Sequence, residues 1–135
     1  MQKSIRIGFL LLIGSQTLHS IEEYSNSLWE VLPQARVISG LISNDLSFGF
    51  AIVNATLVAF GFWCFIGPIQ HGWCGASALM WFWVVLELGN SIGHTYLAID
   101  QGGYFPGLYT MPLLTIFSIY IAFELVTSNG DTNVT

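Results

Sequence analysis

Apolar residues fall into four long runs along the chain, and short polar or glycine-rich stretches separate these runs. An α-helix needs about 20 apolar residues to cross the hydrocarbon of a bilayer, because it rises only about 1.5 Å per residue. Each run is close to this length. The pattern therefore predicts an all-α integral membrane protein, a four-helix bundle with spans at about residues 4–24, 47–66, 74–98 and 105–126.

The segment between the first two spans is more polar, but its apolar residues recur at helical spacing. They are Leu28, Val31, Leu32, Val37, Ile38, Leu41 and Ile42. We predict a short helix here that lies at the membrane interface, begun or broken by Pro33, which has no N–H to continue a helix. The spans together make one membrane domain, residues 1–127, and residues 128–135 are expected to be a flexible tail.

The composition supports the membrane class. Hydrophobic residues make up 53% of the chain and charged residues 8%, with a mean hydropathy of +0.65; a soluble domain averages about 25% charged residues. The net charge of -5 comes from scattered carboxylates, and no basic patch indicates a nucleic-acid partner. Cys64 and Cys74 do not make a disulfide framework. His71 and Cys74 offer only two ligands, which is a weak metal signal.

Two basic residues, Lys3 and Arg6, precede the first apolar run and allow two interpretations. A basic start followed by an apolar stretch is typical of a secretory signal peptide. No good cleavage site follows, so we interpret this run as the first span. Basic residues concentrate on the cytoplasmic side of membrane proteins, and the same two residues therefore predict cytoplasmic termini.

The end of the first span carries the most unusual charge pattern in the chain. His19, Glu22 and Glu23 follow one another at i, i+3 and i+4, so they project from one helix face. Charges in or near hydrocarbon are costly, and they usually pair, ligate an ion or line a pathway. One face with an imidazole and two carboxylates can bind a metal or move protons. The alternative is that the two carboxylates are simply solvated where the span emerges.

Further polar residues fall at matching depth, because consecutive spans run in opposite directions. Asn54 lies early in the second span, Asn90 and His94 lie late in the third, and Tyr104 comes just before the fourth. We therefore predict that the two histidines, Glu23 and Asn90 form one cluster. The alternative for Asn54 and Asn90 is simple hydrogen bonding between helices.

Glu87 shares a helical stripe with Asn90 but lies deeper in the third span. It suits a partner of the cluster or a relay step better than a shared ligand. His71, Cys74 and Glu124 fall on the opposite side of the predicted membrane and are not expected to join.

Three motifs follow one another in order, and they are His19-Ser20-Ile21-Glu22-Glu23, Asn90-Ser91-Ile92-Gly93-His94 and Tyr104-Phe105-Pro106-Gly107. Through these motifs the chain resembles the HXXEE-domain family of small bacterial and archaeal membrane proteins, over about residues 8–123. The resemblance implies a multi-span protein of a bacterial or archaeal cell membrane. It also implies suspected enzymatic or metal-dependent activity, and it names no reaction.

These residues support three functions, and whether the protein is an enzyme stays open among them. In the first, His19, Glu23 and His94 ligate Zn or non-haem Fe, and Glu22 is the catalytic base or a further ligand. An apolar, lipid-like substrate would arrive from the bilayer. Residues that would orient ligands or substrate are Asn54, Glu87, Asn90 and Tyr104.

The second function is metal-free proton transfer of the isomerase kind, in which Glu and His exchange protons. The third is a small structural subunit of a larger membrane complex or homo-oligomer. In that case the polar residues would only hold the helices together.

Overall fold

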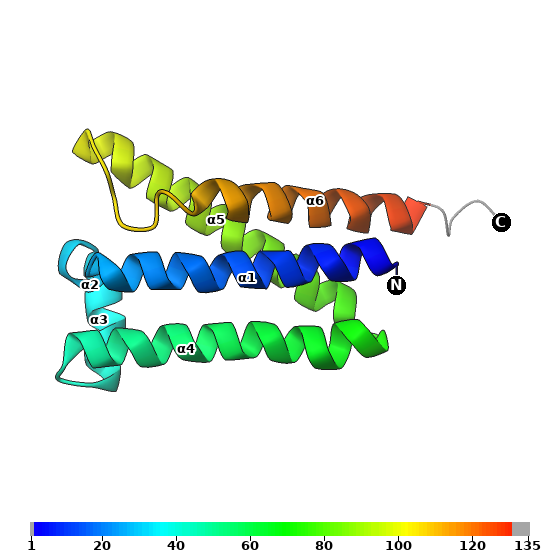
Figure 1. Cartoon of the computed structure of the whole chain (residues 1–135), viewed down its shortest axis with the longest axis horizontal. Coiled ribbons are helices and arrows are strands. Elements are labelled where there is room, and N and C mark those ends of the chain that lie inside the picture. The colour runs from blue at the N-terminus through cyan, green and yellow to red at the C-terminus, as the bar shows by residue number, and fades with distance from the viewer. Residues whose placement is uncertain (1, 131–135) are drawn as a thin grey trace.

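The computed structural model describes residues 2–130, and all regular structure within that range is helical. The elements are α1 (Lys3–Ser25), α2 (Leu28–Val31), α3 (Pro33–Ile42), α4 (Leu46–Cys64), the π-helix η1 (Phe65–Ile69), α5 (Ala76–Gln101) and α6 (Met111–Gly130). Four of these helices are long, and the short α2 and α3 lie across one end of α1 and α4 (Figure 1). The predicted all-α class is confirmed.

The long helices are arranged around α1 (Figure 1). α1 packs against α4 on one side and α6 on the other, whereas α5 runs obliquely behind and packs chiefly against α6. The main core contains Trp83 of α5, Phe9 and Leu12 of α1 and Leu114 of α6, all fully buried. This packing fixes α1 and α5, the two helices that carry the candidate ligands.

The segment before α4 is held by a side-chain cap and by a close backbone approach. Asp45 accepts hydrogen bonds from the Ser47 amide at 3.0 Å and the Phe48 amide at 3.2 Å, which satisfies two N–H groups of the first turn. The Ser47 hydroxyl, which donates to Asp45 at 2.7 Å, and then the Phe48 amide hold the pKa of Asp45 below its usual value. A Cβ at Gly49 would meet the backbone carbonyl oxygen of Ser39, so only glycine lets α3 lie this close to α4.

The helix boundaries depart from the predicted spans at prolines and glycines. Pro68 does not end the second long helix, because the chain widens into η1 and accommodates it. α6 begins at Met111, later than the predicted start at about residue 105, since Pro106 and Gly107, with φ of 95°, belong to a loop.

The segment between the first two predicted spans agrees with its prediction better than the C-terminal end does. The predicted short helix between the first two spans exists as α2 and α3, with Pro33 in the first turn of α3. Residues 128–130 continue α6, and residues 131–135 of the predicted flexible tail lie outside the described residues.

Within residues 2–130, two helical stretches are long and apolar enough to cross a membrane, Leu46–Ile69 and Met111–Ser128. The described residues thus form six α-helices, and two of these contain candidate membrane spans. The predicted bundle of four spans is supported as an all-helical fold with two candidate spans. The other long helices, α1 and α5, bury polar side chains that lower their hydropathy, and these include Gln16, His19, Ser20, Glu23, Glu87, Ser91 and His94.

Candidate metal centre

Three buried side chains from α1 and α5 bring their ligand atoms together. The Nε2 atom of His19 lies 3.0 Å from Oε1 of Glu23, and Nε2 of His94 lies 3.1 Å from the same oxygen. The ligand atoms of all three residues lie within 4.8 Å of one another. His19 is fully buried, and Glu23 and His94 are 6% and 4% exposed. The predicted convergence of His19, Glu23 and His94 is therefore present.

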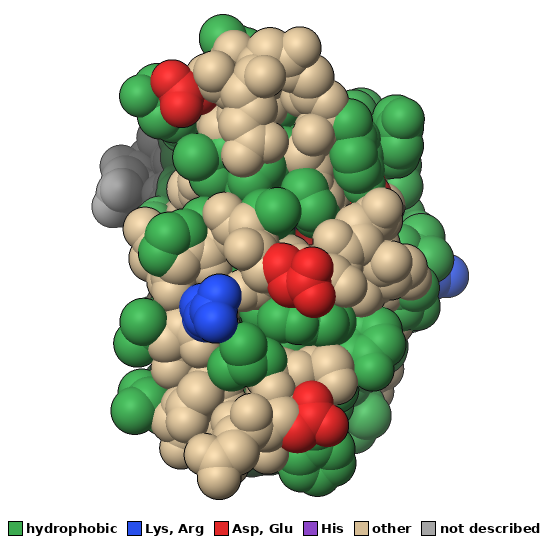
Figure 2. Space-filling view, turned by 90° about the vertical axis from the view of Figure 1, so that its left-hand side faces the viewer, with side chains coloured by type: hydrophobic (Ala, Val, Ile, Leu, Met, Phe, Trp, Pro, Cys, Tyr) green, Lys and Arg blue, Asp and Glu red, His purple; other side chains and the backbone are tan. Residues whose placement is uncertain are grey.

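The cluster lies beneath the end of the molecule that carries α2 and α3. Figure 2 views this end, where a few carboxylates and a cationic side chain are scattered among other polar and apolar groups. No histidine is visible on this face, as expected from the burial of His19 and His94. Bulk water is thus largely kept from the three ligand atoms.

The ring of His94 is oriented by the backbone of the loop that precedes α6. Its Nδ1 atom lies 2.6 Å from the carbonyl oxygen of Pro106. A carbonyl oxygen can only accept, so Nδ1 of His94 carries the proton and donates it. Phe105 packs edge-on against the same ring, with centroids 5.3 Å apart. Nε2 of His94 is therefore the nitrogen turned towards Glu23.

The ring of His19 is oriented in a similar way by Thr110. Nδ1 of His19 lies 2.8 Å from Oγ1 of Thr110. The Thr110 hydroxyl donates its own hydrogen to the Glu22 carboxylate at 2.7 Å or to the Gly107 carbonyl at 3.1 Å. It must then accept from His19, which again places the imidazole proton on Nδ1.

The hydrogen bonds of the two rings determine which atoms face the centre of the cluster. Both imidazoles donate their Nδ1 protons to acceptors outside the cluster, so both Nε2 atoms and the Glu23 carboxylate face one another as electron-pair donors. Three such donors repel unless a cation, either a metal ion or a proton, lies between them. Histidines that bind metals typically donate their other N–H to a carbonyl or a similar acceptor, as His94 does to Pro106.

Asn90 completes the inner cluster. Its Nδ2 atom lies 3.1 Å from Nε2 of His19 and can donate to it. The predicted meeting of His19, Glu23, Asn90 and His94 is therefore present in full. An ion bound to Nε2 of His19 requires the Asn90 amide to release this hydrogen bond.

Glu22 does not point into the cluster but holds the loop that covers it, residues 102–110, which we call the crossing loop. The Glu22 carboxylate accepts hydrogen bonds from the Tyr104 hydroxyl at 2.7 Å, the Tyr109 amide at 3.0 Å, and both the amide and the hydroxyl of Thr110. Burial and the neighbouring Glu22 carboxylate raise the pKa of Tyr104 to about 12. The catalytic role predicted for Glu22 stays a prediction, and its contacts favour a positioning role.

Gly107 lets the crossing loop approach both imidazoles. Its φ of 95° lies in the left-handed region that favours glycine. A Cβ at this position would lie 2.8 Å from Nδ1 of His94 and still closer to Cε1 of His19. A larger residue would therefore displace the loop or both rings.

A second polar group lies deeper along α1 and α5. With the Gln16 amide turned to satisfy its neighbours, its nitrogen donates to the Glu87 carboxylate at 3.0 Å. The Ser20 hydroxyl lies 2.8 Å from Oδ1 of Asn54 and 3.2 Å from the turned Gln16 oxygen, and it donates its one hydrogen to either. The predicted outer residues Glu87 and Asn54 thus join through Gln16 and Ser20 rather than through the histidines.

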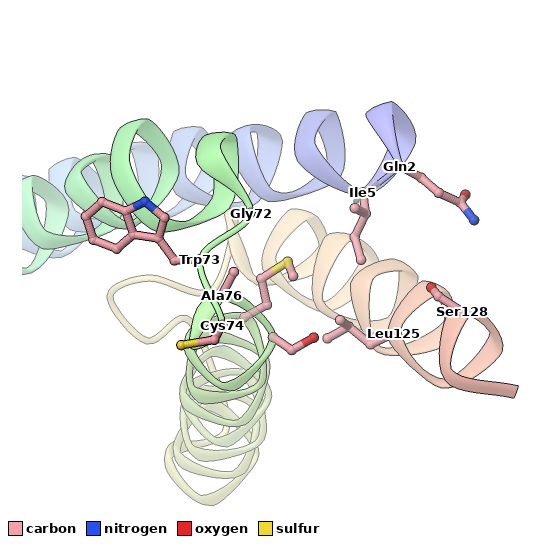
Figure 3. A pocket seen from close by; sticks show the side chains of 10 residues that line it. Gln2, Ile5, Gly72, Trp73, Cys74, Ala76, Leu125 and Ser128 are labelled. Carbon is pink, nitrogen blue, oxygen red and sulfur yellow. The ribbon is translucent and has the colours of Figure 1, made fainter. Parts of the chain in front are cut away.

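The ligand-type residues at the opposite end do not join the cluster. His71 is exposed, and its Nδ1 atom contacts the carbonyl of Gly67 one turn back in its own segment. Cys74 is also exposed and borders a hollow of about 350 Å³ beside Trp73, Leu125 and Ser128 (Figure 3). This agrees with the prediction that His71 and Cys74 fall on the opposite side from the cluster and do not join it.

The residues that orient the candidate ligands carry little signal in the sequence. The Tyr104-Phe105-Pro106-Gly107 motif predicts a role for Tyr104 and none for Pro106 or Gly107. Thr110 carried no signal at all, since a threonine between apolar residues is common. Gln16, one helical turn before Ser20, could have been found as a further polar residue on the stripe of α1 that carries His19 and Glu23.

Comparison with known proteins gives a family and no activity. A family model described as a protein of unknown function with HXXEE motif matches residues 10–121, which is most of the chain. No curated protein and no solved structure matches. His19, Glu22 and Glu23, which stand at the spacing that gives this motif its name, either donate to the cluster or anchor the loop above it. The chain belongs to the HXXEE family of proteins of unknown function.

Proposed function

We propose that this protein is a membrane-embedded metalloprotein in which His19, Glu23 and His94 bind one transition-metal ion. The observation that carries the proposal is the orientation of the two imidazoles. Pro106 and Thr110 fix both Nδ1 protons, so that both Nε2 atoms face one carboxylate oxygen. A buried arrangement of three electron-pair donors is suited to a cation.

The donor set suits zinc or non-haem iron. Two imidazoles and one carboxylate are the protein ligands of many catalytic zinc sites and of non-haem iron sites, and both leave positions open for water or substrate. Such an ion supplies Lewis acidity or an activated water. The protein's part is to hold the rings through the crossing loop, with Asn90 beside the open side. We propose an enzymatic role on an apolar, lipid-like substrate.

The proposed membrane setting rests on the outer surface of the helices. Alongside the two apolar candidate spans, α1 and α5 expose large apolar side chains, such as Leu18 at 52% and Val85 at 66%. Exposed apolar surface of this kind is expected to contact lipid or another protein. We propose that all four long helices span the membrane, with cytoplasmic termini because of Lys3 and Arg6. A reporter fused after Thr135 should be active only in the cytoplasm, and activity outside would reverse the orientation.

Proton transfer is the second candidate function. The distances of 3.0 and 3.1 Å from Glu23 to the two rings are hydrogen-bond lengths, so a proton on either Nε2 would also satisfy the cluster. Glu23 and the histidines would then exchange protons with a substrate without a metal.

A metal measurement on the purified full chain separates these functions. We expect about one zinc or iron ion per chain by elemental analysis, with affinity falling in acid as the ligands become protonated. His94→Ala should lose the ion and keep its helicity. His71→Ala, a histidine at the opposite end, should bind as the wild type does.

Two outcomes would contradict the metal proposal. Metal-free protein that does not take up zinc or iron, yet turns over a lipid substrate, would favour proton transfer. Metal-free protein recovered only inside a larger assembly would favour a structural subunit.

A further inference from the structure

A cavity of about 520 Å³ lies between α4 and α5 on the side of α1 away from α6, with α3 beside it. Its walls are mostly apolar, and Ile38, Phe50, Leu57 and Val85 are typical of them. The volume falls within the range of about 300–1,000 Å³ that small-molecule sites occupy. α4 packs on α1 and α3, whereas α5 packs chiefly on α6. The backbones of α4 and α5 therefore make few close contacts, and side chains border the space between the two helices.

Polar side chains line one part of this cavity and reach the candidate metal centre. Glu23, a proposed ligand, borders the cavity together with Asn90, which contacts His19. Glu87, 1% exposed, borders it as well, beside Gln16. A molecule in the cavity would therefore place a polar group against the centre and an apolar part against the remaining walls.

The wall formed by α3 carries a buried group whose hydrogen-bonding capacity is unused. Ser39 is 1% exposed and borders the cavity, and its hydroxyl has no hydrogen-bond partner. Its position is fixed, because its backbone carbonyl rests on Gly49. An unpartnered buried hydroxyl is costly, and a ligand or a water in the cavity would relieve that cost.

The charges around the cavity restrict the polar group of a ligand. Two acidic side chains, Glu23 and Glu87, border it, and no Lys or Arg is among the described residues that line it. A carboxylate or phosphate head group would leave water for a mostly apolar cavity that offers it no Lys or Arg partner. A hydroxyl can donate to a carboxylate or accept from Ser39, so it suits this wall without adding charge.

We propose that this cavity binds a single-chain lipid with an uncharged hydroxyl head group, a long-chain alcohol, as the substrate class of the centre. The hydroxyl lies among Glu23, Glu87 and Asn90, and the chain lies between α4 and α5. This inference rests on the proposed function in placing the head group beside the metal ligand Glu23. The modest volume favours one chain over a two-chain phospholipid.

Photo-crosslinking of the purified full chain in detergent tests this proposal. The probe is hexadecanol carrying a diazirine on its chain, and labelled peptides are mapped by mass spectrometry. We expect labels on cavity-lining segments of α4 and α5, competed by unlabelled hexadecanol. The diazirine analogue of palmitate should label at least about tenfold less, because its carboxylate would enter a mostly apolar cavity without a Lys or Arg partner.

Two tryptophan substitutions on α4 supply a matched pair. Leu57→Trp fills the cavity and should abolish the specific labels, whereas Ile52→Trp, an exposed position outside the cavity lining, should leave them. Ile38→Trp, on α3 at the exposed rim of the cavity, is a second blocking variant if Leu57→Trp does not fold.

Metal content measured on the same samples separates this inference from the proposed function. Bound metal with labels that Leu57→Trp and Ile38→Trp leave unchanged would overturn the alcohol site and retain the metal centre. Specific labels on protein that takes up no zinc or iron would retain the alcohol site and overturn the metal centre. Equal labelling by the alcohol and the palmitate analogue, or stronger labelling by a long-chain amine, would overturn the choice of head group.

Discussion

The two ends of the helical assembly contain similar residue types with very different surroundings. At one end, His19 and His94 have both ring nitrogens engaged by other elements, and both rings are buried. At the other end, His71 is exposed and contacts only a carbonyl of its own segment among the hydrogen bonds described for it. Histidines and nearby ligand-type residues thus make a site only where separate elements fix the rings.

The crossing loop is the structural source of this difference. It brings the Pro106 carbonyl to His94 and the Thr110 hydroxyl to His19, and Glu22 on α1 holds it in place. The turn near His71 contributes no comparable hydrogen bond among the described residues. We therefore expect variants at the cluster to weaken metal binding or stability in a definite order. Loss of a proposed ligand should have the largest effect, disruption of the loop geometry a smaller one, and loss of a loop anchor the smallest.

The largest effect is expected from removing the shared carboxylate. Glu23→Gln keeps the shape of the side chain but removes the charge that both Nε2 atoms face. Loss of a ligand should exceed the roughly 10–100-fold loss in metal affinity that outer partners give. Calorimetric titration with zinc measures it. Glu124→Gln at the opposite end is the matched control, and equal affinities for the two variants would contradict the assignment of Glu23.

The next largest effect is expected from closing the space at Gly107. Gly107→Ala adds a Cβ that meets both imidazoles, at a positive φ. Gly102→Ala is the matched control, because Gly102 also has a positive φ, of 70°, but has no atom within 4 Å of the added Cβ.

Both glycine variants should lose about 1 kcal/mol of unfolding free energy through the backbone conformation. Only Gly107→Ala should lose a further ~1–3 kcal/mol from the clash, and only it should impair metal binding. Thermal unfolding and zinc titration measure these changes. If the two variants behaved alike, the close approach of the loop to the rings would have no energetic role.

The sequence predicted the helices and the convergence of the candidate ligands better than it predicted the geometry of the loop. Helical spacing and alternating span direction were enough to predict that four residues lie together, because helices have a fixed rise and period. These residues are His19, Glu23, Asn90 and His94. Those rules do not apply to residues 102–110, whose path depends on tertiary hydrogen bonds. The sequence therefore carries no signal for the contacts of Pro106 and Thr110 with the rings, and the contacts of Glu22 with the loop leave its predicted catalytic role a prediction.

The membrane spans show the reverse limitation. Hydropathy identifies α4 and α6 most clearly, because they carry little of the polar cluster. In α1 and α5 the polar side chains point inwards, and a sequence average cannot separate them from the apolar outer face. The positions of the breaks also followed tertiary structure, since η1 absorbed Pro68 while Pro106 stayed in a loop.

A smaller effect is expected from removing the loop anchor. Glu22→Ala deletes the acceptor of four hydrogen bonds to the crossing loop. We expect metal affinity to fall roughly 10–100-fold, as for other groups that orient ligands. Glu30→Ala, an exposed carboxylate at the same end, is the control in zinc titrations. Unchanged affinity in Glu22→Ala would instead favour the catalytic role predicted from the sequence.

The smallest effect is expected from Tyr104, which supplies one of the hydrogen bonds to Glu22. Tyr104→Phe should lower the unfolding free energy by about 1 kcal/mol at neutral pH. The folded-state pKa of Tyr104 is about 12, above the usual value of about 10 in an unfolded chain. A raised pKa means that the contribution is complete below about pH 10 and is lost as the pH rises through about 12. The difference in melting temperature between wild type and Tyr104→Phe should therefore narrow over this range. Tyr96→Phe, at a 65% exposed position, should show no such narrowing, and a constant difference for Tyr104→Phe would show that its hydroxyl does not stabilise the loop through Glu22.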